Sequence, residues 1–203
     1  ATLLRTSGFG FEIIGRRLSA VRAPGGAIPC DRAVIAAGIR SKPLARAAGD
    51  RIPLETERGY HALILDPAAG PRHPTMPSDG RMAITRMRGG LRVAGQVELA
   101  GLNAAPDWRR AKILLEHAAR AYPALGRKLG PERVRFWMGH RPATPDGLPC
   151  IGPAVGCPDV LHAYGHGHIG LTSGPMTGRL VADLIGEHAP VIDPVPYSPR
   201  RFR

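Results

Sequence analysis

The spacing of apolar side chains along the chain predicts three helices. Apolar residues recur at intervals of three and four over residues 106–122, which is typical of an amphipathic helix. Residues 172–185 carry a second apolar face of this kind near the end of the chain, and a short helix is expected over residues 41–48. The prolines that follow residue 189 predict an extended tail rather than a helical one.

Apolar runs of strand length lie between these helices. Residues 32–38 form an almost continuous apolar run that ends in glycine, which suits a strand covered on both faces. Residues 82–85 and 91–99 flank a Gly-Gly pair, and glycine supplies the positive φ that a tight hairpin turn requires. Further short strands are expected around residues 11–21, 60–65, 134–139 and 160–164.

The composition is that of an ordinary globular protein. With 203 residues, of which 43% are hydrophobic, the chain can bury the core of one large domain or two small ones. Its apolar runs fall far short of the roughly 20 residues that a bilayer-spanning helix needs, and no targeting leader is expected. The three cysteines form no CxxC pair, which argues against a disulfide framework or a four-cysteine zinc site and predicts a cytoplasmic protein.

The net charge of +12 raises the question of a nucleic-acid partner. The arginines are scattered among Ala, Gly and Pro instead of being gathered on one helix. We therefore expect no nucleic-acid binding, and attraction to anionic substrates or to an anionic membrane surface is the preferred alternative.

A glycine-rich segment between the expected strand 160–164 and the last helix satisfies the pattern GxGxxG at residues 165–170. The dinucleotide-binding fingerprint also requires a second parallel strand after the helix, and here the helix is followed by prolines. Two interpretations remain open. The backbone N–H groups of Gly170, Leu171 and Thr172 face an anion such as a reduced flavin, or the segment is a glycine-rich turn that binds nothing.

The histidines His140, His162, His166 and His168 suggest a metal site only weakly. No carboxylate or cysteine shares the cluster, so no metal is expected. No GxSxG or HExxH motif is present in the sequence.

For Arg141 and for Cys150, the sequence allows both a chemical role and a purely structural one. Arg141 lies where a strand meets a turn, and its planar guanidinium could hold a carboxylate in bidentate fashion, although a solvated surface arginine fits as well. Cys150 is a possible nucleophile, but a small packed apolar side chain is the preferred interpretation.

Several of these segments, in their order along the chain, resemble the D-amino-acid oxidase and dehydrogenase superfamily. The most specific stretch is residues 136–149, FWMGHRPATPDGLP, which continues to the glycine loop at residues 165–167. Residues 31–38 and the hairpin at residues 83–95 also resemble family segments. The similarity covers nearly the whole chain and is strongest to the bacterial D-amino-acid dehydrogenase branch.

The resemblance implies an α+β fold. It consists of a mostly antiparallel β-sheet substrate domain with helices, together with partial segments of a Rossmann-like FAD-binding domain. The implied boundaries are residues 1–40 for the end of the first FAD-domain segment and residues 41–150 for the substrate domain. Residues 151–203 then return to the FAD domain with the final helix and the proline-rich tail.

The resemblance also assigns roles to individual residues. Arg141 is expected to grip the substrate carboxylate, and His168 to lie above the flavin. Tyr60 either lines the substrate pocket or is an ordinary strand aromatic. The residues expected to contact FAD are Gly38, Gly165, His166, Gly167, His168, Ile169, Gly170, Leu171 and Thr172.

The implied activity is oxidation of the Cα–N bond of a D-amino acid by hydride transfer to FAD, with electrons passed to an acceptor other than oxygen. A D-hydroxyproline, glycine or sarcosine oxidoreductase and a non-catalytic assembly module are the alternatives. The family's N-terminal FAD-binding motif has no counterpart here, which implies a truncated homologue or one subunit of a split enzyme whose partner supplies that segment. The acceptor implies a second possible location, peripheral at the inner membrane.

Overall fold

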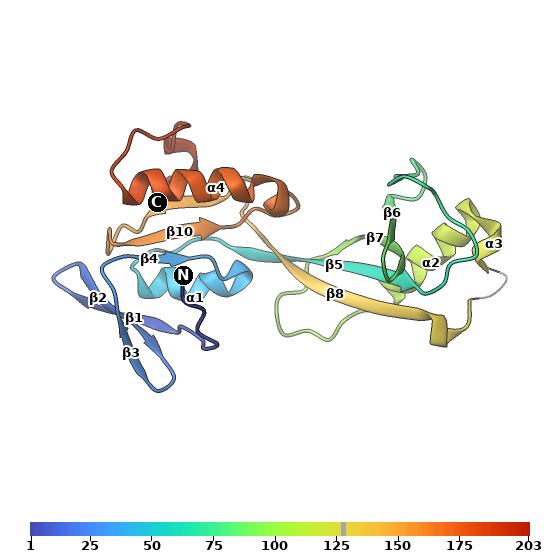
Figure 1. The fold of residues 1–203 in the computed structure, drawn as a ribbon, viewed down its shortest axis with the longest axis horizontal. Coiled ribbons are helices and arrows are strands. Elements are labelled where there is room, and N and C mark those ends of the chain that lie inside the picture. The colour runs from blue at the N-terminus through green and yellow to red at the C-terminus, as the bar shows by residue number, and fades with distance from the viewer. Residues whose placement is uncertain (127–128) are drawn as a thin grey trace. The chain divides into compact units, whose positions relative to one another are not determined.

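The computed structural model describes residues 1–126 and 129–203, and this chain forms two compact units. Unit 1 combines Ala1–Glu55 with Arg141–Arg203, and unit 2 comprises Thr56–His140 (Figure 1). The structure thus divides the chain at positions 55/56 and 140/141, and the strands Glu55–Ile64 and Val134–Ala143 cross these positions. The domain boundaries at 40/41 and 150/151 that the resemblance implied stay a prediction.

The central sheet of unit 1 has three strands in the order β4-β10-β9. Strand β10 pairs parallel with β4 and antiparallel with β9, which brings two distant parts of the chain together. The helix α4 packs Leu180 and Val181 against Ile151 and Leu161 of this sheet. The bounds are Ala33–Ile35 for β4, Cys150–Pro153 for β9, Val160–Tyr164 for β10, Ser41–Ala47 for α1 and Gly170–Ile185 for α4.

The run at residues 32–38 forms a shorter strand than the sequence predicts. Strand β4 ends at Ile35, and Gly38 at φ 57° begins the short 3-10 turn η1, Gly38–Arg40. In the described part of the chain β4 is an edge strand, and Val34 is 43% exposed. The expected cover on both faces is therefore not present in this structure.

An antiparallel meander completes unit 1. Its strands are β1, Gly10–Ile14; β2, Arg17–Ala23; and β3, Gly26–Pro29, as the short strands and turns of the sequence predict. The buried Asp159 carboxylate ties this meander to the central sheet. It accepts hydrogen bonds from Arg17 Nε at 2.7 Å, from the Leu18 backbone N–H at 3.0 Å and from Arg32 Nη1 at 2.5 Å.

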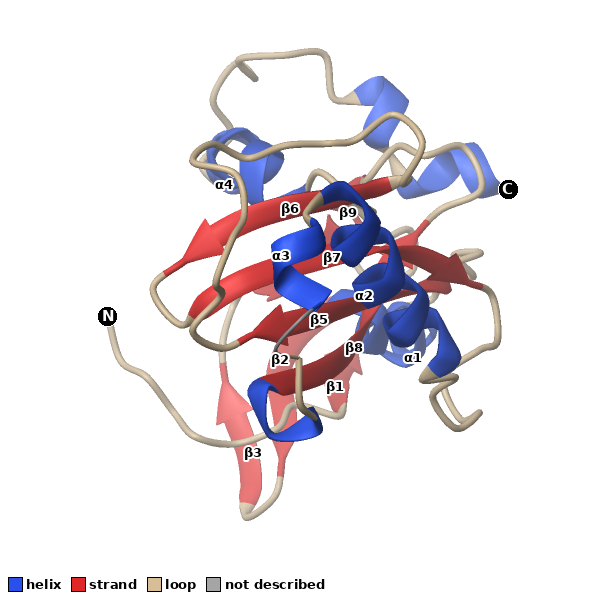
Figure 2. Cartoon of the chain, turned by 90° about the vertical axis from the view of Figure 1, so that its right-hand side faces the viewer, coloured by secondary structure: helices blue, strands red, loops and turns tan. Residues whose placement is uncertain are grey.

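Unit 2 is a four-stranded antiparallel sheet in the order β6-β7-β5-β8 with helix α2 on one face (Figure 2). The predicted hairpin is confirmed, since β6 and β7 pair from Met82↔Gly95 to Met87↔Gly90. Helix α2 contributes Ala111, Leu114 and Ala118 to the core. The bounds are Glu55–Ile64 for β5, Met82–Met87 for β6, Gly90–Glu98 for β7, Val134–Ala143 for β8, Arg109–Ala121 for α2, Pro123–Gly126 for α3 and Pro131–Arg133 for the 3-10 turn η2.

A fully buried arginine fixes the loop between β7 and α2. Arg58 is 0% exposed, and its guanidinium donates to the carbonyl oxygens of Gly101 at 2.8 Å, Ala104 at 2.7 Å and Ala105 at 3.2 Å. The Glu98 carboxylate lies 3.5 Å from Arg58 Nη1 and provides the counter-charge. A buried charge is tolerated here because it is paired and its N–H groups are used.

The C-terminal tail differs from the extended segment that the prolines predict. It contains two 3-10 turns, η3, Val195–Tyr197, and η4, Pro199–Phe202, each of which begins with or includes proline where no N–H is needed. Arg201 then bonds the Asp146 carboxylate at 2.7 Å and stacks over the Phe202 ring. Among the described residues, no helix is long and apolar enough to cross a bilayer.

Candidate active site

The glycine loop and Gly38 lie at one edge of the central sheet of unit 1. Ile35 of β4 pairs with His162 of the parallel strand β10. Gly38 and Gly165 each follow that pair by three residues, so both emerge from the carboxyl ends of neighbouring parallel strands. This is the edge at which ligands bind in open parallel sheets. The structure therefore brings together two segments that sequence reasoning placed at the cofactor.

The loop leads directly into an uncapped helix. Helix α4 begins at Gly170, and its N-cap residue Ile169 provides no side-chain cap, so among the described residues no side-chain cap is found for its first N–H groups. The side chain of Leu171 is 97% exposed, so the first turn of this 16-residue helix is open on that side. Free N–H groups and the helix dipole make such an end favourable for a group that carries negative charge.

The shape of the loop depends on glycine at its first position. Gly165 has φ 88°, a left-handed conformation that glycine adopts without strain. A Cβ there would lie 3.2 Å from Thr144 Cγ2, so the neighbouring turn leaves little room for a side chain.

The end of β8 runs alongside this loop. Ala143 and His166 form an antiparallel bridge, and the Gly167 N–H donates to the Pro142 carbonyl at 2.9 Å. Arg141 precedes this contact by one residue and is half-buried. The arginine of the family motif and the loop that leads into α4 are thus joined by backbone pairing within unit 1.

The two histidines of the loop differ in environment. His166 shares a 2.8 Å hydrogen bond with Thr177 Oγ1 of α4, and burial lowers the pKa of its imidazole. His166 is therefore neutral near pH 7 and anchors the loop to the helix. His168 is exposed.

Tyr60 lies in the core of unit 2, whereas one of the two alternatives from the resemblance placed it at the substrate pocket. It is 1% exposed and packs in the core of unit 2. Its hydroxyl donates to Glu98 Oε2 at 2.5 Å and accepts the Asp107 N–H at 3.0 Å. Burial, followed by the hydrogen bond to Glu98, raises its pKa. The structure supports the structural alternative, in which Tyr60 is a strand aromatic that holds the loop before α2.

Sequence reasoning missed a row of hydrogen-bonded buried side chains, Asp50, His162 and Tyr164, which ends at the residue before the glycine loop. His162 Nε2 lies 2.9 Å from Asp50 Oδ2, and the Tyr164 hydroxyl lies 3.0 Å from His162 Nδ1. The same Asp50 oxygen accepts the Val155 N–H at 2.9 Å. Burial would raise the pKa of Asp50, but the hydrogen bonds from His162 and Val155 outweigh it and lower the pKa. No local sequence pattern marks this row of side chains, because Asp50 and His162 are 112 positions apart.

The other candidates of the sequence have structural partners. Among the described residues no three His, Cys, Asp or Glu side chains form a group that could hold a metal ion. His140 Nδ1 shares a 3.0 Å hydrogen bond with Thr56. Cys150 is 0% exposed, and burial raises the pKa of its thiol to about 12, so it is protonated at neutral pH and not a ready nucleophile.

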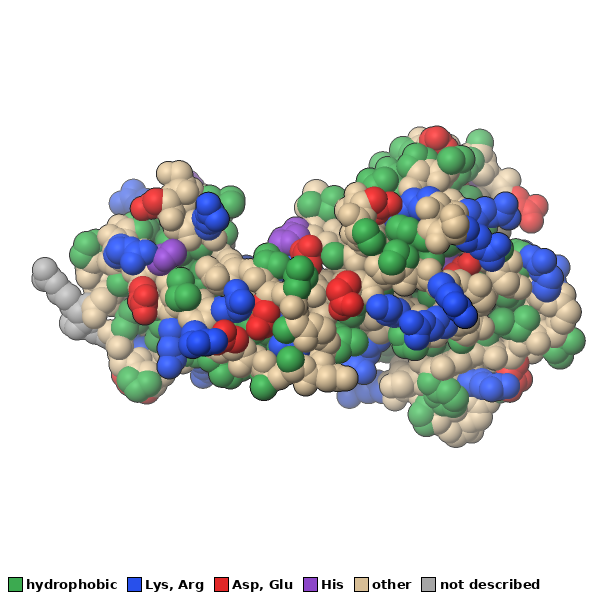
Figure 3. Space-filling model, turned by 180° about the vertical axis from the view of Figure 1, so that it is seen from behind, with side chains coloured by type: hydrophobic (Ala, Val, Ile, Leu, Met, Phe, Trp, Pro, Cys, Tyr) green, Lys and Arg blue, Asp and Glu red, His purple; other side chains and the backbone are tan. Residues whose placement is uncertain are grey.

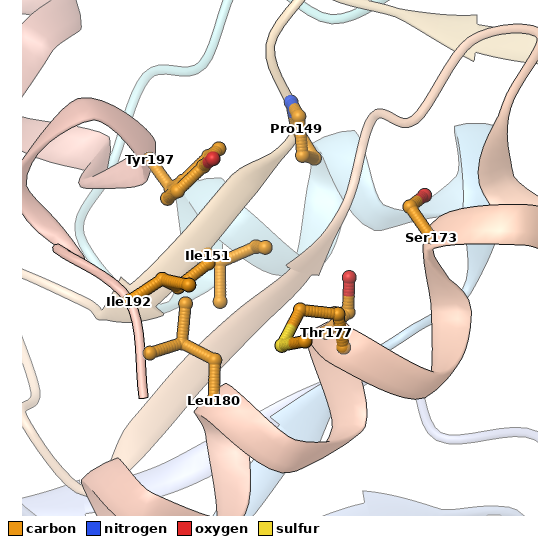
Figure 4. Close-up of a pocket in the computed structure, with 8 residues that line it drawn as sticks. Pro149, Ile151, Ser173, Thr177, Leu180, Ile192 and Tyr197 are labelled. Carbon is orange, nitrogen blue, oxygen red and sulfur yellow. The ribbon is translucent and has the colours of Figure 1, made fainter. Parts of the chain in front are cut away.

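A small cavity lies beside α4, between that helix, β9 and the tail. Its volume is about 70 Å³, and its walls include Ile151, Thr177, Leu180 and Tyr197 (Figure 4). The lining is mainly apolar, and the volume is far below the roughly 300 Å³ at which ligand pockets begin. We interpret it as a packing space behind the His166–Thr177 contact.

Charged side chains are dispersed over the visible surface of both units, with acidic groups among the arginines and lysines (Figure 3). This distribution agrees with the scatter of arginines along the sequence. The expected absence of a nucleic-acid partner stays a prediction.

The chain belongs to the DAO family of FAD dependent oxidoreductases, whose pattern it matches over residues 5–184. It is 50% identical over 202 residues to a D-amino-acid oxidase of Bradyrhizobium diazoefficiens, covering 100% of this chain and 48% of that protein. It is 36% identical over 189 residues to a D-amino acid dehydrogenase of Xanthobacter autotrophicus, covering 92% of this chain and 44% of that protein. The chain thus spans about half the length of these relatives.

The fold is shared with solved structures of the same kind. A glycine oxidase from Geobacillus kaustophilus superposes with a TM-score of 0.81 at 24% identity, covering 95% of this chain and 51% of that one. The predicted α+β class, with antiparallel sheets and parallel-sheet segments of an FAD-binding fold, is confirmed. FAD is the cofactor of the family.

Proposed function

We propose that this chain carries the substrate clamp and the flavin-facing loop of an enzyme that oxidises the Cα–N bond of a D-amino acid. The observation that carries the proposal is the backbone pairing of Pro142 with Gly167. It holds Arg141 beside the loop that leads into the open end of α4.

The residues at the sheet edge fit an anionic heteroaromatic group. The donors are the backbone N–H groups of Gly170, Leu171 and Thr172, at a helix end without a side-chain cap. Gly38 lies at the same edge, and a Cβ at Gly38 would meet nothing within 4 Å, so the space next to it is open. When bound, FAD supplies the hydride acceptor. The helix end would stabilise the negative charge that the reduced flavin carries.

Arg141 would bind the substrate carboxylate through two parallel N–H···O bonds. Such a clamp fixes the position of the α-carbon without taking part in bond breaking. His168, exposed at the loop, is proposed to lie close to the flavin, whereas the neutral His166 positions the loop through Thr177. Substrates that share the α-carboxylate, namely D-hydroxyproline, glycine and sarcosine, remain alternatives to a D-amino acid.

A second polypeptide segment is part of the proposal. The relatives are about twice as long as this chain, and we propose that the dinucleotide-binding part of the site comes from sequence outside it, in the same polypeptide or in a partner subunit. For the transfer of electrons from the flavin to an acceptor other than oxygen, we propose that the protein makes a peripheral contact with a membrane-bound electron acceptor.

The clamp is tested by Arg141→Leu in the protein as its gene encodes it, assayed with D-alanine, D-proline, glycine and sarcosine and an artificial electron-accepting dye. We expect kcat/KM to fall about a hundredfold, mainly through KM, because a bidentate charged contact to the substrate is lost. Arg120→Leu, at an exposed position of α2, is the matched control and should leave both constants unchanged.

The flavin proposal has a separate readout. Bound FAD, measured by its absorbance after gel filtration, should be equal in Arg141→Leu and the unaltered protein, since the clamp acts on substrate alone. An unchanged KM in Arg141→Leu removes the arginine from the carboxylate role. A folded protein that retains no flavin in any form supports the non-catalytic alternative.

A further inference from the structure

The sheet of unit 2 has one face in the core and a second face with an unusual set of side chains. Helix α2 packs on the face that carries Tyr60, Ile84 and Val93. Because side chains alternate along a strand, His61 and Trp137 lie on the opposite face. We call the set His61, Arg92, Arg135 and Trp137 the His61 face.

An aromatic pair lies at the centre of the His61 face. The His61 imidazole stacks on the Trp137 indole with ring centroids 4.9 Å apart and an interplanar angle of 20°. Trp137 remains 52% exposed. A Cβ at Gly139 would lie 1.9 Å from Trp137 Cη2, so glycine at this position allows the indole to lie over the strand. The stack leaves the indole as an apolar surface next to a polar ring.

His61 has an unused polar atom. Its Nδ1 is screened from solvent and has no hydrogen-bond partner among the described residues. Such buried atoms usually have a partner, and an exception calls for an explanation. Burial, with a smaller effect from the charge of Arg92, lowers the pKa of His61. The ring is therefore neutral near pH 7, and in one tautomer its Nδ1–H can donate a hydrogen bond to an added acceptor.

Two cations accompany this atom. In the pairing of β5 with β7, Arg92 lies opposite Leu63 and Ala94 opposite His61, so Arg92 is the diagonal neighbour of His61. Arg135 precedes Trp137 by two residues on β8 and is exposed on the same face. The side-chain hydrogen bonds and ion pairs found among the described residues include none for the guanidinium groups of Arg92 and Arg135. The acidic residue of this face on β5, Glu57, lies four residues from His61, about 13 Å along the strand.

We propose that His61, Arg92 and Trp137 form a binding site for the carboxylate of a small organic acid. The guanidinium of Arg92 supplies the charge and a planar fork that suits a carboxylate, and His61 Nδ1 supplies a directed donor. The exposed surface of Trp137 provides apolar contact for the carbon chain of the ligand. A cation is disfavoured by the two arginines, and a neutral ligand would leave them without a counter-charge.

The experiment uses the intrinsic fluorescence of Trp137. The chain has two tryptophans, and Trp108 packs against Tyr60 and Phe136 on the core face. Trp108→Phe therefore leaves Trp137 as the one tryptophan of this chain. Butyrate, butyramide and inorganic phosphate are titrated into this variant at constant ionic strength and pH 7. We expect butyrate to change the emission saturably, with a dissociation constant of about 1–10 mM, and butyramide to have no effect.

Substitutions in the same background locate the binding. Arg92→Gln, and separately His61→Phe, which keeps a ring for the stack, should raise the dissociation constant about tenfold or more. Arg88→Gln, at the exposed turn of the same hairpin, is the matched control and should leave it unchanged. Circular dichroism of each variant verifies the fold.

The result must also be independent of the proposed clamp. In Arg141→Leu the butyrate signal should persist; if it disappears, the signal belongs to Arg141 and the site at His61 is refuted while the clamp is supported. An unchanged constant in folded Arg92→Gln, a butyramide response equal to that of butyrate, or binding of phosphate alone would each overturn the proposal.

Discussion

Unit 2 is built from one continuous stretch of chain, whereas unit 1 is closed by two stretches that are far apart in sequence. In unit 2 the core comes from a hairpin and from the helix that follows it. In unit 1 the central sheet includes the long-range pairing of β4 with β10, and buried carboxylates join positions more than a hundred residues apart: Asp50 with His162, and Asp159 with Arg17. Folding of unit 1 therefore costs more loop-closure entropy than folding of unit 2. The polar contacts of unit 1 must offset this larger loss of entropy.

The chain contains separate reporters for the two units. The three cysteines, Cys30, Cys150 and Cys157, are in unit 1, and the two tryptophans, Trp108 and Trp137, are in unit 2. Cys150 and Cys157 are 0% exposed, so their reaction with dithiodipyridine reports the opening of unit 1. Tryptophan fluorescence reports the unfolding of unit 2.

The largest effect is expected in unit 2, from Arg58→Leu. The substitution leaves the Glu98 carboxylate with Arg110 as its remaining cation, at 3.7 Å, and the carbonyls of Gly101 and Ala104 without the donors that Arg58 supplied. We expect a loss of about 4 kcal/mol in the free energy of unfolding. The measurement is the urea dependence of tryptophan fluorescence, with Arg120→Leu as the control.

The same variant tests the independence of the units. If each unit unfolds by itself, the reactivity of Cys150 and Cys157 keeps its urea midpoint in Arg58→Leu. A parallel shift of both midpoints would show that the two units unfold as one, and the comparison drawn above would not hold.

The next effect is expected in unit 1, from Asp50→Ala. The change removes the acceptor of His162 Nε2 and of the Val155 N–H in a buried position. We expect a loss of about 3 kcal/mol, seen as faster thiol reaction at low urea with tryptophan fluorescence unchanged. Asp50→Asn, which keeps an acceptor oxygen, should lose less. Equal losses for the two variants would mean that packing, and not the hydrogen bonds, stabilises this position.

The Asp50 contribution also has a defined pH dependence. Because the pKa of Asp50 is lowered in the folded state, its stabilisation is fully present above the pKa of an unfolded aspartate, about 3.9. It is lost as the pH falls through the lower folded pKa. The difference between the unaltered protein and Asp50→Ala should therefore shrink at acid pH, and a difference that grows would contradict the assigned sign.

The smallest effect is expected from Asp146→Asn at the tail contact. Hydrogen bonds from Arg201 lower the pKa of Asp146 to about 2, against the opposing effect of burial. The side chain is 37% exposed, so solvent screening limits the loss to less than about 1 kcal/mol. The stabilisation should be constant above about pH 4 and disappear as the pH approaches 2. Thiol reactivity of Cys150 provides the measurement, with Asp79→Asn, an exposed position in unit 2, as the control.

The amino-acid sequence determined the features of this protein that depend on neighbours in the chain. The hairpin of β6 and β7, the apolar faces of α2 and α4, and the glycine loop before α4 each follow from local spacing, and residues 136–149 indicated the family. Only the tertiary structure decided which of these residues meet. The pairing of Pro142 with Gly167, the burial of Tyr60 against Glu98, the Asp50–His162 contact and the His61–Trp137 stack each join strands or loops separated by many residues. Local periodicity carries no information about such pairings, since they are selected by the register of the sheets and by the need of each buried polar group for a partner.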